Sequence, residues 1–264
     1  MPHVELPSGT FFYRYDGQHD APLLVLSNSL GTGHSMWDKQ LPVFARHFRV
    51  LRYDSRGHGA SAAPAGPYTI EDLGQDVIHL YQALGISRAH YCGLSMGGMV
   101  GMWLAANAPE RVDRLALCNT AARLGPPQLW GARIKAVRVG GMPAIVSAVL
   151  VRWFTASFMS RANGVIEHMR QVLANTSAEG YIACCAAIRD MDQRAILSRI
   201  RATTLVIAGT LDAASAPADG RFLANSIAGA RYVELNAAHL TNIEAADAFT
   251  DTVVRFLTGD MEGD

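Results

Sequence analysis

Charged residues are scarce in this sequence. Only 17% of the 264 residues are Asp, Glu, Lys or Arg, and the formal net charge is zero. Proteins that bind nucleic acids or anionic membrane surfaces usually carry an excess of basic residues, so the composition indicates neither kind of partner. Half of the residues are hydrophobic, which is enough to fill the core of one large domain. We therefore expect a single domain whose partners are small molecules.

Long apolar segments and metal-type cysteine patterns are also missing. The longest apolar run, Met142 to Val151, is about half as long as a membrane span, and Met1 to Glu5 show neither the basic nor the apolar part of a secretory signal. These features predict a cytoplasmic protein without membrane contact. The cysteines have no metal-ligand spacing, and two of them are adjacent, which is an awkward geometry for a disulfide. We expect reduced, buried thiols at all four, which are Cys92, Cys118, Cys184 and Cys185.

Short runs of apolar or β-branched residues recur along the chain and are typical of strands. Helical patterns, in which apolar residues recur at three- and four-residue spacing, separate most of these runs from the third onward. This alternation predicts an α/β fold with a mostly parallel sheet of eight strands. The sequence Pro7-Ser8-Gly9 between the first two runs favours an antiparallel hairpin at one edge. The expected strands are Val4–Leu6, Phe11–Tyr15, Leu23–Ser27, Arg49–Tyr53, Ala89–Gly93, Arg114–Cys118, Thr204–Ala208 and Tyr232–Leu235, and the expected helices are Gln40–His47, Thr69–Leu84, Met96–Ala108, Ala218–Ile227 and Ile243–Leu257.

The strand pattern stops between Thr120 and Thr203, where helical stretches are broken by glycine and proline. We expect residues 123–201 to form a helical cap inserted after the sixth strand, while residues 1–122 and 202–264 form the core. The segment from Ala121 to Arg201 contains eleven Lys or Arg and four Asp or Glu, a net charge of +7 that the rest of the chain balances. Most of these basic residues are expected on solvated helix faces, but the excess would also attract an anionic substrate.

One short motif indicates chemistry. Residues Gly93-Leu94-Ser95-Met96-Gly97 fit the G-x-S-x-G pattern of a nucleophile elbow, a sharp turn between a strand and a helix. Small residues are needed on both sides because the turn is crowded and the serine backbone is strained. The pattern alone also occurs by chance. A predicted strand before it and a predicted helix after it favour Ser95 as a nucleophile that attacks a carbonyl carbon.

A serine hydroxyl needs a base within hydrogen-bond reach and an acid that orients the base. Where this elbow is used, the acid and then the histidine follow the serine along the chain. His239 lies in a loop after the last strand, and Asp212 lies in the loop after the seventh, both at the carboxyl edge of the predicted sheet. Asn119, at the end of the sixth strand, occupies the other position where such folds place the acid, but an amide cannot serve as one. His58 precedes the serine in a glycine-rich turn, and we expect it to have a structural role.

The negative oxygen that forms when a carbonyl is attacked needs two hydrogen-bond donors. The elbow supplies the backbone N–H of Met96, and the second donor usually comes from the loop after the third strand. Here that loop is Ser27-Asn28-Ser29-Leu30-Gly31-Thr32, and we assign the N–H of Leu30.

These features together resemble the α/β-hydrolase superfamily along almost the whole chain. The resemblance includes Arg56-Gly57-His58-Gly59-Ala60-Ser61 after the fourth strand, as well as the elbow, Asp212 and His239. Three further stretches resemble the 3-oxoadipate enol-lactonases, which are bacterial enzymes of aromatic-compound breakdown. They are Ser27 to Thr32, Cys184 to Asp192 and Asn236 to Glu244.

The enol-lactonase resemblance implies a substrate and a set of roles. The substrate would be a five-membered enol-lactone with a free carboxylate, the product would be 3-oxoadipate, and neither a metal nor an organic cofactor would be required. Ser95 would be the nucleophile, His239 the base and Asp212 the acid that orients it. Leu30 and Met96 would be the oxyanion donors.

A buried substrate carboxylate needs a charged partner, and the forked guanidinium of arginine suits it. Arg133 and Arg138 are our candidates because they lie near Trp130 in the cap, just after the sixth strand. Trp130 and Ser29 are further candidates for substrate contact, although aromatic residues in a cap more often pack between helices.

Two alternative functions stay open. One is a general carboxylesterase or cofactor-free perhydrolase that uses the same three residues behind a different pocket. The other is a non-catalytic ligand receptor on the same scaffold, which usually lacks one of the three. All three are present here, so the sequence favours an enzyme.

Overall fold

The computed structural model describes residues 2–261 and contains one eight-stranded sheet with the strand order β1-β2-β4-β3-β5-β6-β7-β8. All eight predicted strands are present, and their ends differ from the prediction by at most two residues. The strands are β1 (His3–Leu6), β2 (Gly9–Asp16), β3 (Leu23–Ser27), β4 (Arg49–Tyr53), β5 (Ala89–Leu94), β6 (Val112–Cys118), β7 (Thr203–Gly209) and β8 (Arg231–Leu235).

The pairing of the strands gathers the functional loops at one edge. β1 and β2 form the predicted antiparallel hairpin, and β2 pairs antiparallel with β4. The remaining neighbours in the sheet pair in parallel. β5, near the middle, is buried at every residue, as expected where helices cover both faces of a parallel sheet. The loops that follow the parallel strands therefore meet at their common carboxyl edge.

The helices of the core follow the predicted pattern. α3 packs against α2 and β5, and α1 packs against α11. α2 begins after Thr69, whose hydroxyl accepts the N–H of Asp72 while the Asp72 carboxylate accepts the N–H of Thr69. These core helices are α1 (Leu41–His47), α2 (Ile70–Ala83), α3 (Met96–Asn107), α9 (Pro217–Ser226) and α11 (Ala246–Thr258).

One predicted helix, Ile243–Leu257, is divided in the structure. The chain forms the short α10 (Thr241–Glu244), leaves the helical conformation at Ala245 (φ −116°, ψ 48°) and continues as α11. The break places the Glu244 carboxylate where it accepts the N–H groups of Ala238 (3.0 Å) and Thr155 (3.2 Å). The apolar spacing continues through both helices, so it did not reveal the interruption.

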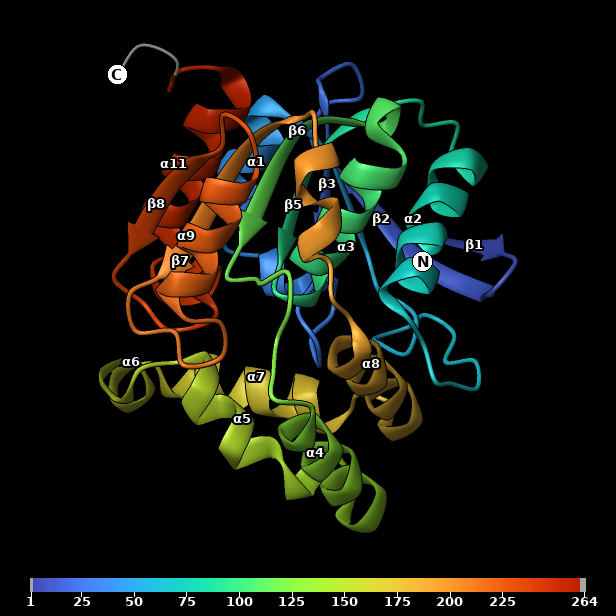
Figure 1. Cartoon of the computed structure of the whole chain (residues 1–264), viewed down its shortest axis with the longest axis vertical. Helices are drawn as coiled ribbons and strands as arrows, with labels where there is room; N and C mark the ends of the chain where they lie inside the picture. The colour runs from blue at the N-terminus through green and yellow to red at the C-terminus, as the bar shows by residue number, and fades with distance from the viewer. Residues whose placement is uncertain (1, 262–264) are drawn as a thin grey trace.

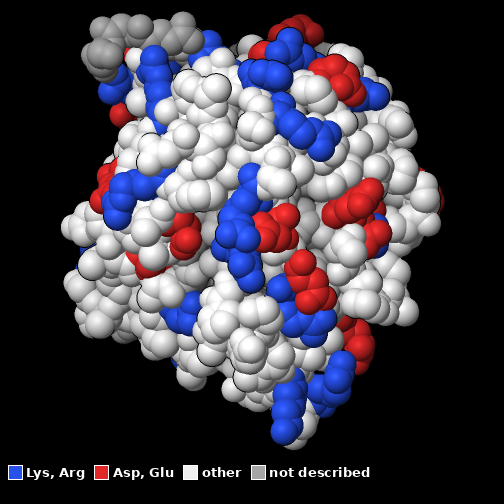
Figure 2. Space-filling model, in the orientation of Figure 1, with Lys and Arg blue, Asp and Glu red and all other residues white. Residues whose placement is uncertain are grey.

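Between β6 and β7 the described chain forms helices and no strand. These cap helices lie together at one end of the sheet (Figure 1). Figure 2 shows basic side chains at the lower tip of the molecule, over the region of α4, whereas charges of both signs are mixed on the rest of this face. The division at residues 122 and 202 between core and cap stays a prediction. The cap helices are α4 (Pro127–Gly140), α5 (Val146–Trp153), α6 (Ala156–Arg161), α7 (Asn163–Ala174) and α8 (Ala178–Asp190).

All four cysteines are buried and free, as predicted. The Sγ atoms of Cys92 on β5 and Cys118 on β6 lie 3.9 Å apart, and burial raises the pKa of the Cys118 thiol well above its usual value. These two thiols therefore behave as small apolar groups of the core. No helix formed by residues 2–261 is long and apolar enough to span a membrane.

Candidate active site

Ser95 lies on a tight turn between β5 and α3, at the carboxyl edge of the sheet. Its backbone has φ 56° and ψ −114°, a conformation that residues other than glycine rarely adopt. The turn requires glycine on both sides, because a Cβ atom at Gly93 would collide with the backbone of Gly97, and one at Gly97 with the backbone of Ser27. The N–H of Ser95 donates to the Cys118 carbonyl (2.8 Å) and ties the turn to the end of β6. This strained position holds the serine at the N-terminus of α3.

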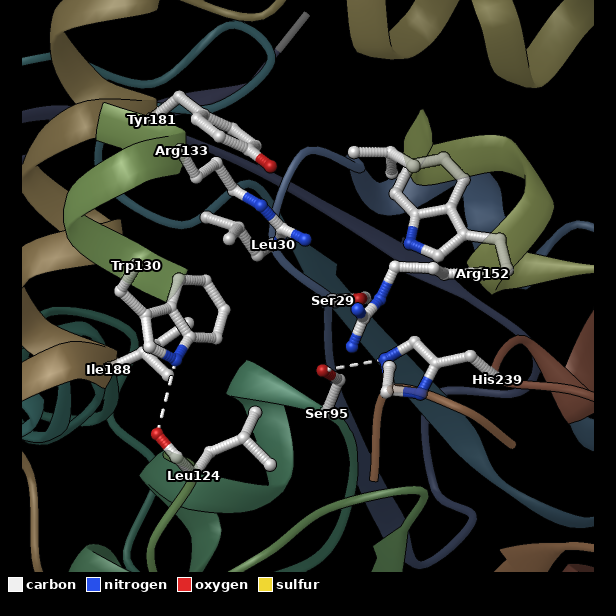
Figure 3. A pocket seen from close by; sticks show the side chains of 13 residues that line it. Ser29, Leu30, Ser95, Leu124, Trp130, Arg133, Arg152, Tyr181, Ile188 and His239 are labelled. Atoms are coloured by element: carbon white, nitrogen blue, oxygen red, sulfur yellow. Dashed lines mark hydrogen bonds between the residues drawn. The ribbon is translucent and has the colours of Figure 1, made fainter. Parts of the chain in front are cut away.

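The structure brings Ser95, His239 and Asp212 together from three separate loops. Nε2 of His239 lies 2.9 Å from Oγ of Ser95 (Figure 3), and Nδ1 lies 2.8 Å from Oδ2 of Asp212. A carboxylate only accepts hydrogen bonds, so Nδ1 carries the proton and Nε2 is free to accept the serine proton. All three residues are buried, with 4% to 6% of their surface exposed. The Ser95 hydroxyl is therefore a candidate nucleophile with its base already aligned.

Asp212 is held by more than the imidazole. Its Oδ1 accepts the backbone N–H groups of Ala214 (2.7 Å) and Ser215 (3.0 Å), and its Oδ2 also accepts the Ser215 hydroxyl (2.8 Å). Burial would raise the pKa of Asp212, but the charge of His239 and the hydrogen bonds to the carboxylate outweigh burial and lower the pKa below its usual value. Asp212 is therefore ionised at neutral pH.

Asn119 is part of this network, although the sequence pointed only to its inability to act as the acid. Its Nδ2 donates to Oδ2 of Asp212 (3.1 Å) and to the Ala238 carbonyl (3.3 Å), and its Oδ1 accepts the Thr241 hydroxyl (2.6 Å). Asn119 thus joins the loop of the acid to the loop of the histidine. The position of Asn119 at the end of β6 indicated that it lies near the site, but spacing along the chain could not show which side chains it contacts. The same is true of Ser215.

The two predicted oxyanion donors, the backbone N–H groups of Leu30 and Met96, lie in adjoining loops. Met96 is the first residue of α3, where N–H groups have no partner within the helix. The Gly97 N–H donates to the Asn28 carbonyl (3.0 Å), which joins the elbow to the loop that carries Leu30. Within residues 2–261 neither the Leu30 nor the Met96 N–H donates to another residue. Both donors are available to a ligand beside Ser95.

A pocket lies in front of Ser95, between the sheet edge and the cap. In Figure 3 the guanidinium groups of Arg133 and Arg152 both point into this space, the latter beside Ser95 and His239. Of the substrate-contact residues predicted from the sequence, three line the pocket: Ser29 from the core, and Trp130 and Arg133 from α4. The lining residues that were not predicted include two polar ones, Arg152 on α5 and Tyr181 on α8, and the apolar Leu124, Val149, Trp153, Ile188 and Ala214.

The pocket holds two positive charges, and none of the described residues that line it is acidic. The guanidinium carbon of Arg133 lies 4.9 Å from the centre of the Trp130 ring, and Nη2 of Arg152 donates to the Ala213 carbonyl (3.0 Å). Burial, and then the charge of Arg133, lower the pKa of Arg152, but an arginine stays protonated at neutral pH. The Asp212 carboxylate acts in the other direction and raises the pKa of Arg152 from behind the pocket wall. No acidic side chain among the described residues lines the pocket itself, so the two neighbouring cations favour the binding of an anion there.

Arg138, the other predicted carboxylate ligand, lies elsewhere. It is exposed and lines a surface groove with Glu179 and Arg189 of α8. Five residues advance an α-helix by about 140° beyond a full turn, so Arg133 and Arg138 face different directions on α4. The structure thus places Arg138 outside the pocket in front of Ser95, and Arg152 contributes the second cation of that pocket. The sequence did contain a feature that could have indicated Arg152, because it is the only charged residue between Met142 and Phe154.

Within residues 2–261 no cluster of three or more His, Cys, Asp or Glu side chains could hold a metal ion. What the pocket does contain is a hydroxyl aligned on an imidazole, two free N–H groups and two cations. This set of groups suits nucleophilic attack on the carbonyl of a small anionic ester.

The chain is similar in sequence and in structure to known proteins. Residues 22–246 match the α/β hydrolase fold family. The chain is 44% identical to 3-oxoadipate enol-lactonase 2 of Acinetobacter baylyi over 241 residues, which cover 91% of this chain and 90% of that protein. It is 32% identical to a putative carbamate hydrolase, RutD, of Pseudomonas savastanoi pv. phaseolicola, with 91% of this chain and 95% of that one covered. The solved structure of the enol-lactonase from Burkholderia xenovorans LB400 superposes with a TM-score of 0.96 at 53% identity, covering 97% of this chain and 100% of that one. The chain is a hydrolase, and it belongs to the α/β-hydrolase fold family.

Proposed function

We propose that this protein opens 3-oxoadipate enol-lactone, a five-membered ring with a free carboxylate, to 3-oxoadipate. The observation that supports this most directly is that one pocket combines Ser95, aligned on His239, with two arginines and no acidic residue among the described residues that line it. The 44% identity to a 3-oxoadipate enol-lactonase supports the same substrate. The enzyme would then act in the breakdown of aromatic compounds in the cytoplasm.

The first half of the reaction acylates Ser95. Nε2 of His239 takes the hydroxyl proton while the serine oxygen attacks the lactone carbonyl carbon. The resulting oxyanion accepts hydrogen bonds from the N–H groups of Leu30 and Met96, beside the positive end of the α3 dipole. Asp212 stabilises the imidazolium and keeps it in one orientation.

Collapse of this intermediate breaks the bond between the carbonyl carbon and the ring oxygen. The oxygen leaves as an enolate and takes the proton from Nε2 of His239, which returns the imidazole to its neutral form. An enolate is a weaker base than an alkoxide, so this protonation is less demanding. Because the ring has only opened, the whole substrate stays attached to Ser95 as an ester. His239 then takes a proton from water, the hydroxide attacks the ester, and Ser95 recovers its proton as the acid departs. The enol product tautomerises to the ketone.

The two arginines of the pocket would bind the substrate carboxylate. Arg133 and Arg152 come from different cap helices and reach from opposite sides into the space in front of Ser95 (Figure 3). A guanidinium presents five N–H donors, and Arg152 uses one of them on the Ala213 carbonyl, so donors remain for a carboxylate. The cap would therefore select anionic lactones, while the sheet edge would carry out the reaction.

The test of the nucleophile is Ser95→Ala. Loss of the enol-lactone absorbance is followed with purified wild-type protein and with the variant. We expect kcat to fall roughly 10⁵-fold or more, because the alanine leaves no atom to be acylated. Ser87→Ala, which changes an exposed serine before β5, is the matched control and should leave kcat unchanged. Turnover by Ser95→Ala within tenfold of the wild type would refute the assignment.

A substrate panel separates lactonase activity from the alternatives. The values of kcat/KM are compared for the enol-lactone, for the neutral ester p-nitrophenyl acetate and for a small carbamate. We expect the lactone to be preferred, because only it carries the carboxylate that the two arginines can bind. Preference for the neutral ester or the carbamate would contradict the lactonase proposal and leave the hydrolase mechanism intact. Lack of turnover of all three would favour a ligand receptor.

A further inference from the structure

His58 is a buried titratable residue that the mechanism above does not use. It follows β4, only 1% of its surface is exposed, and it does not line the pocket. Its Nε2 accepts the backbone N–H of Gly31 (2.8 Å), and its Nδ1 lies 3.1 Å from the Arg56 carbonyl. Since a carbonyl cannot donate, the proton is on Nδ1 and Nε2 is a pure acceptor. Both ring nitrogens are therefore committed to the backbone.

We propose that His58 is a positioning residue of the oxyanion site, which fixes the peptide next to Leu30 so that the Leu30 N–H points at the reacting oxygen. The inference rests on the proposed function, because it assigns the Leu30 N–H to the oxyanion. The Gly31 N–H that His58 binds belongs to the peptide directly after the Leu30 Cα. Fixing that peptide removes one of the two rotations that would turn the Leu30 N–H away from Ser95.

The opposite side of Gly31 is held by the cap, which leaves the loop little freedom. The Thr176 hydroxyl, between α7 and α8, shares its proton between the Val172 carbonyl (3.0 Å) and the Gly31 carbonyl (3.4 Å). Gly31 has φ +78°, and a Cβ atom there would lie 2.6 Å from Leu173 and 3.1 Å from Tyr181. The loop thus needs glycine at this position, and glycine by itself would be free to move. The hydrogen bond from Gly31 to His58 supplies the restraint that the missing side chain cannot.

His58 is itself held in place by the residues around it. The guanidinium of Arg56 donates from Nε and Nη2 to the two carboxylate oxygens of Asp76 (2.5 Å each). The next residue, Gly57, packs so closely on α8 that a Cβ atom there would lie 2.6 Å from the Cα of Gly180. The carbonyl that accepts the His58 proton is therefore part of a rigid turn. Such support is what a positioning residue requires.

The neutral form of the ring is needed for this role. Burial lowers the pKa of His58 and outweighs the Arg56 carbonyl and the nearby Asp54 carboxylate, which both favour a proton on the ring. A protonated ring would place an N–H against the Gly31 N–H, and two donors cannot form a hydrogen bond. At neutral pH the acceptor is present.

The test compares substitutions that keep or remove the acceptor. His58→Leu removes it, while His58→Gln places an amide oxygen close to the position of Nε2. We expect His58→Leu to lower kcat on the enol-lactone about 100-fold, the usual effect of losing one oxyanion donor, with KM within a factor of about three. His58→Gln should recover at least tenfold of that loss. His90→Leu, at a buried histidine of β5 away from the loop, is the matched control and should leave kcat unchanged.

A second readout reports on the oxyanion site directly. Phenylboronic acid adds the Ser95 oxygen to boron, the serine proton passes to His239, and a boron-bound oxygen takes the place of the oxyanion. Its affinity should fall with kcat in His58→Leu and recover in His58→Gln. Wild-type kcat and boronic acid affinity in His58→Leu would overturn the inference, and so would a loss of kcat without a loss of boronic acid affinity.

Two outcomes need a further comparison. If His58→Leu does not fold, His58→Asn takes its place, because asparagine reaches the position of Nδ1 and not that of Nε2. Equal activity of the Asn and Gln variants would then overturn the inference. Failure of the proposed function is recognised separately, because the wild-type protein would then prefer the neutral ester or the carbamate to the enol-lactone, whatever the residue at 58.

Discussion

The carboxyl edge of the sheet and the cap contribute to the same pocket in different ways. At the sheet edge, Ser95, Asp212 and His239 are buried, and each carboxylate oxygen of Asp212 accepts at least two hydrogen bonds. In the cap, Arg133 contacts an aromatic ring and Arg152 donates to one carbonyl. The edge satisfies the Asp212 carboxylate within the protein and keeps two backbone N–H groups free beside Ser95, whereas the cap keeps guanidinium donors free for a ligand. Chemistry and recognition are thus placed on different parts of the molecule.

This division between sheet edge and cap predicts that substitutions at the sheet edge alter kcat and that substitutions in the cap alter KM. The largest effect is expected for Asp212→Asn. An asparagine cannot accept the Nδ1 proton as a carboxylate does and leaves the imidazole in the wrong tautomer, so kcat should fall about 10⁴-fold with little change in KM. Steady-state hydrolysis of the enol-lactone provides the measurement.

Asp219→Asn is the matched control for that experiment, because Asp219 is a nearby acid on α9 outside the pocket. It should keep wild-type kcat. A loss of less than tenfold in Asp212→Asn would show that the hydrogen bond from His239 to Asp212 does not contribute to the rate.

The sheet edge was largely predictable from the sequence because its parts depend on local rules. Strand patterns are short-range, the elbow needs glycine at fixed positions, and the acid and the histidine follow in the loops after successive strands. The contacts of Asn119 and Ser215 with Asp212 were not predictable. The contact of Asn119 depends on how two loops far apart in the chain meet. Ser215 lies three residues after Asp212 in the same loop, but this spacing alone does not show that the loop folds its N–H and hydroxyl back onto the carboxylate.

The second prediction concerns the cap. Arg152→Met keeps most of the side-chain volume and removes the charge, so KM for the carboxylated lactone should rise roughly 10- to 100-fold, the usual range for a hydrogen bond to a charged group. KM for p-nitrophenyl acetate should change by less than about threefold, because that ester has no carboxylate. Kinetics on the two substrates provide the measurement.

Arg138→Met is the matched control in the cap, since Arg138 lies on α4 but lines a different groove. It should leave both KM values unchanged. If Arg152→Met raised both KM values equally, Arg152 would have a packing role and the division between edge and cap would fail. If Arg138→Met raised KM for the lactone alone, Arg138 would be a ligand of the substrate carboxylate, as the sequence predicted.

The residues of the cap pocket were only partly predictable because helix orientation depends on packing. The buried residues Ile134 and Val137 set which face of α4 meets the rest of the cap. This choice turns Arg133 toward Ser95 and Arg138 toward the surface. The sequence shows an apolar stripe on each cap helix, but not which residue beside the stripe ends above the nucleophile.

The third prediction tests whether the edge acts as a network. Asn119→Ala removes the hydrogen bond to Oδ2 of Asp212 and leaves the lining of the pocket unchanged. We expect kcat to fall about tenfold, since one hydrogen bond to a charged group is lost while four other donors to the carboxylate remain, and KM to stay constant. Asn107→Ala, at the exposed end of α3, is the control in the same assay. A change in KM larger than that in kcat would contradict a positioning role.

The smallest effect is expected in the pH dependence of stability, where a core acid and a cap acid can be compared. The pKa of Asp212 is lower in the folded protein than its ordinary value of 3.8. Its contribution to the free energy of unfolding is therefore fully present above about pH 4 and is lost as the pH falls through the folded pKa. Urea unfolding between pH 6 and pH 2 should show a shallower acid loss for Asp212→Asn than for the wild type.

Asp192 in the cap is an exposed acid, in contrast to the buried Asp212. Hydrogen bonds from Arg194 lower the pKa of Asp192 to about 2, yet the ion pair is exposed, and solvent and salt screen it. Asp192→Asn should therefore have almost the same acid unfolding curve as the wild type in about 0.5 M salt, although its carboxylate has a strongly lowered pKa. If Asp192→Asn flattened the curve as much as Asp212→Asn, burial would not be what separates the two regions.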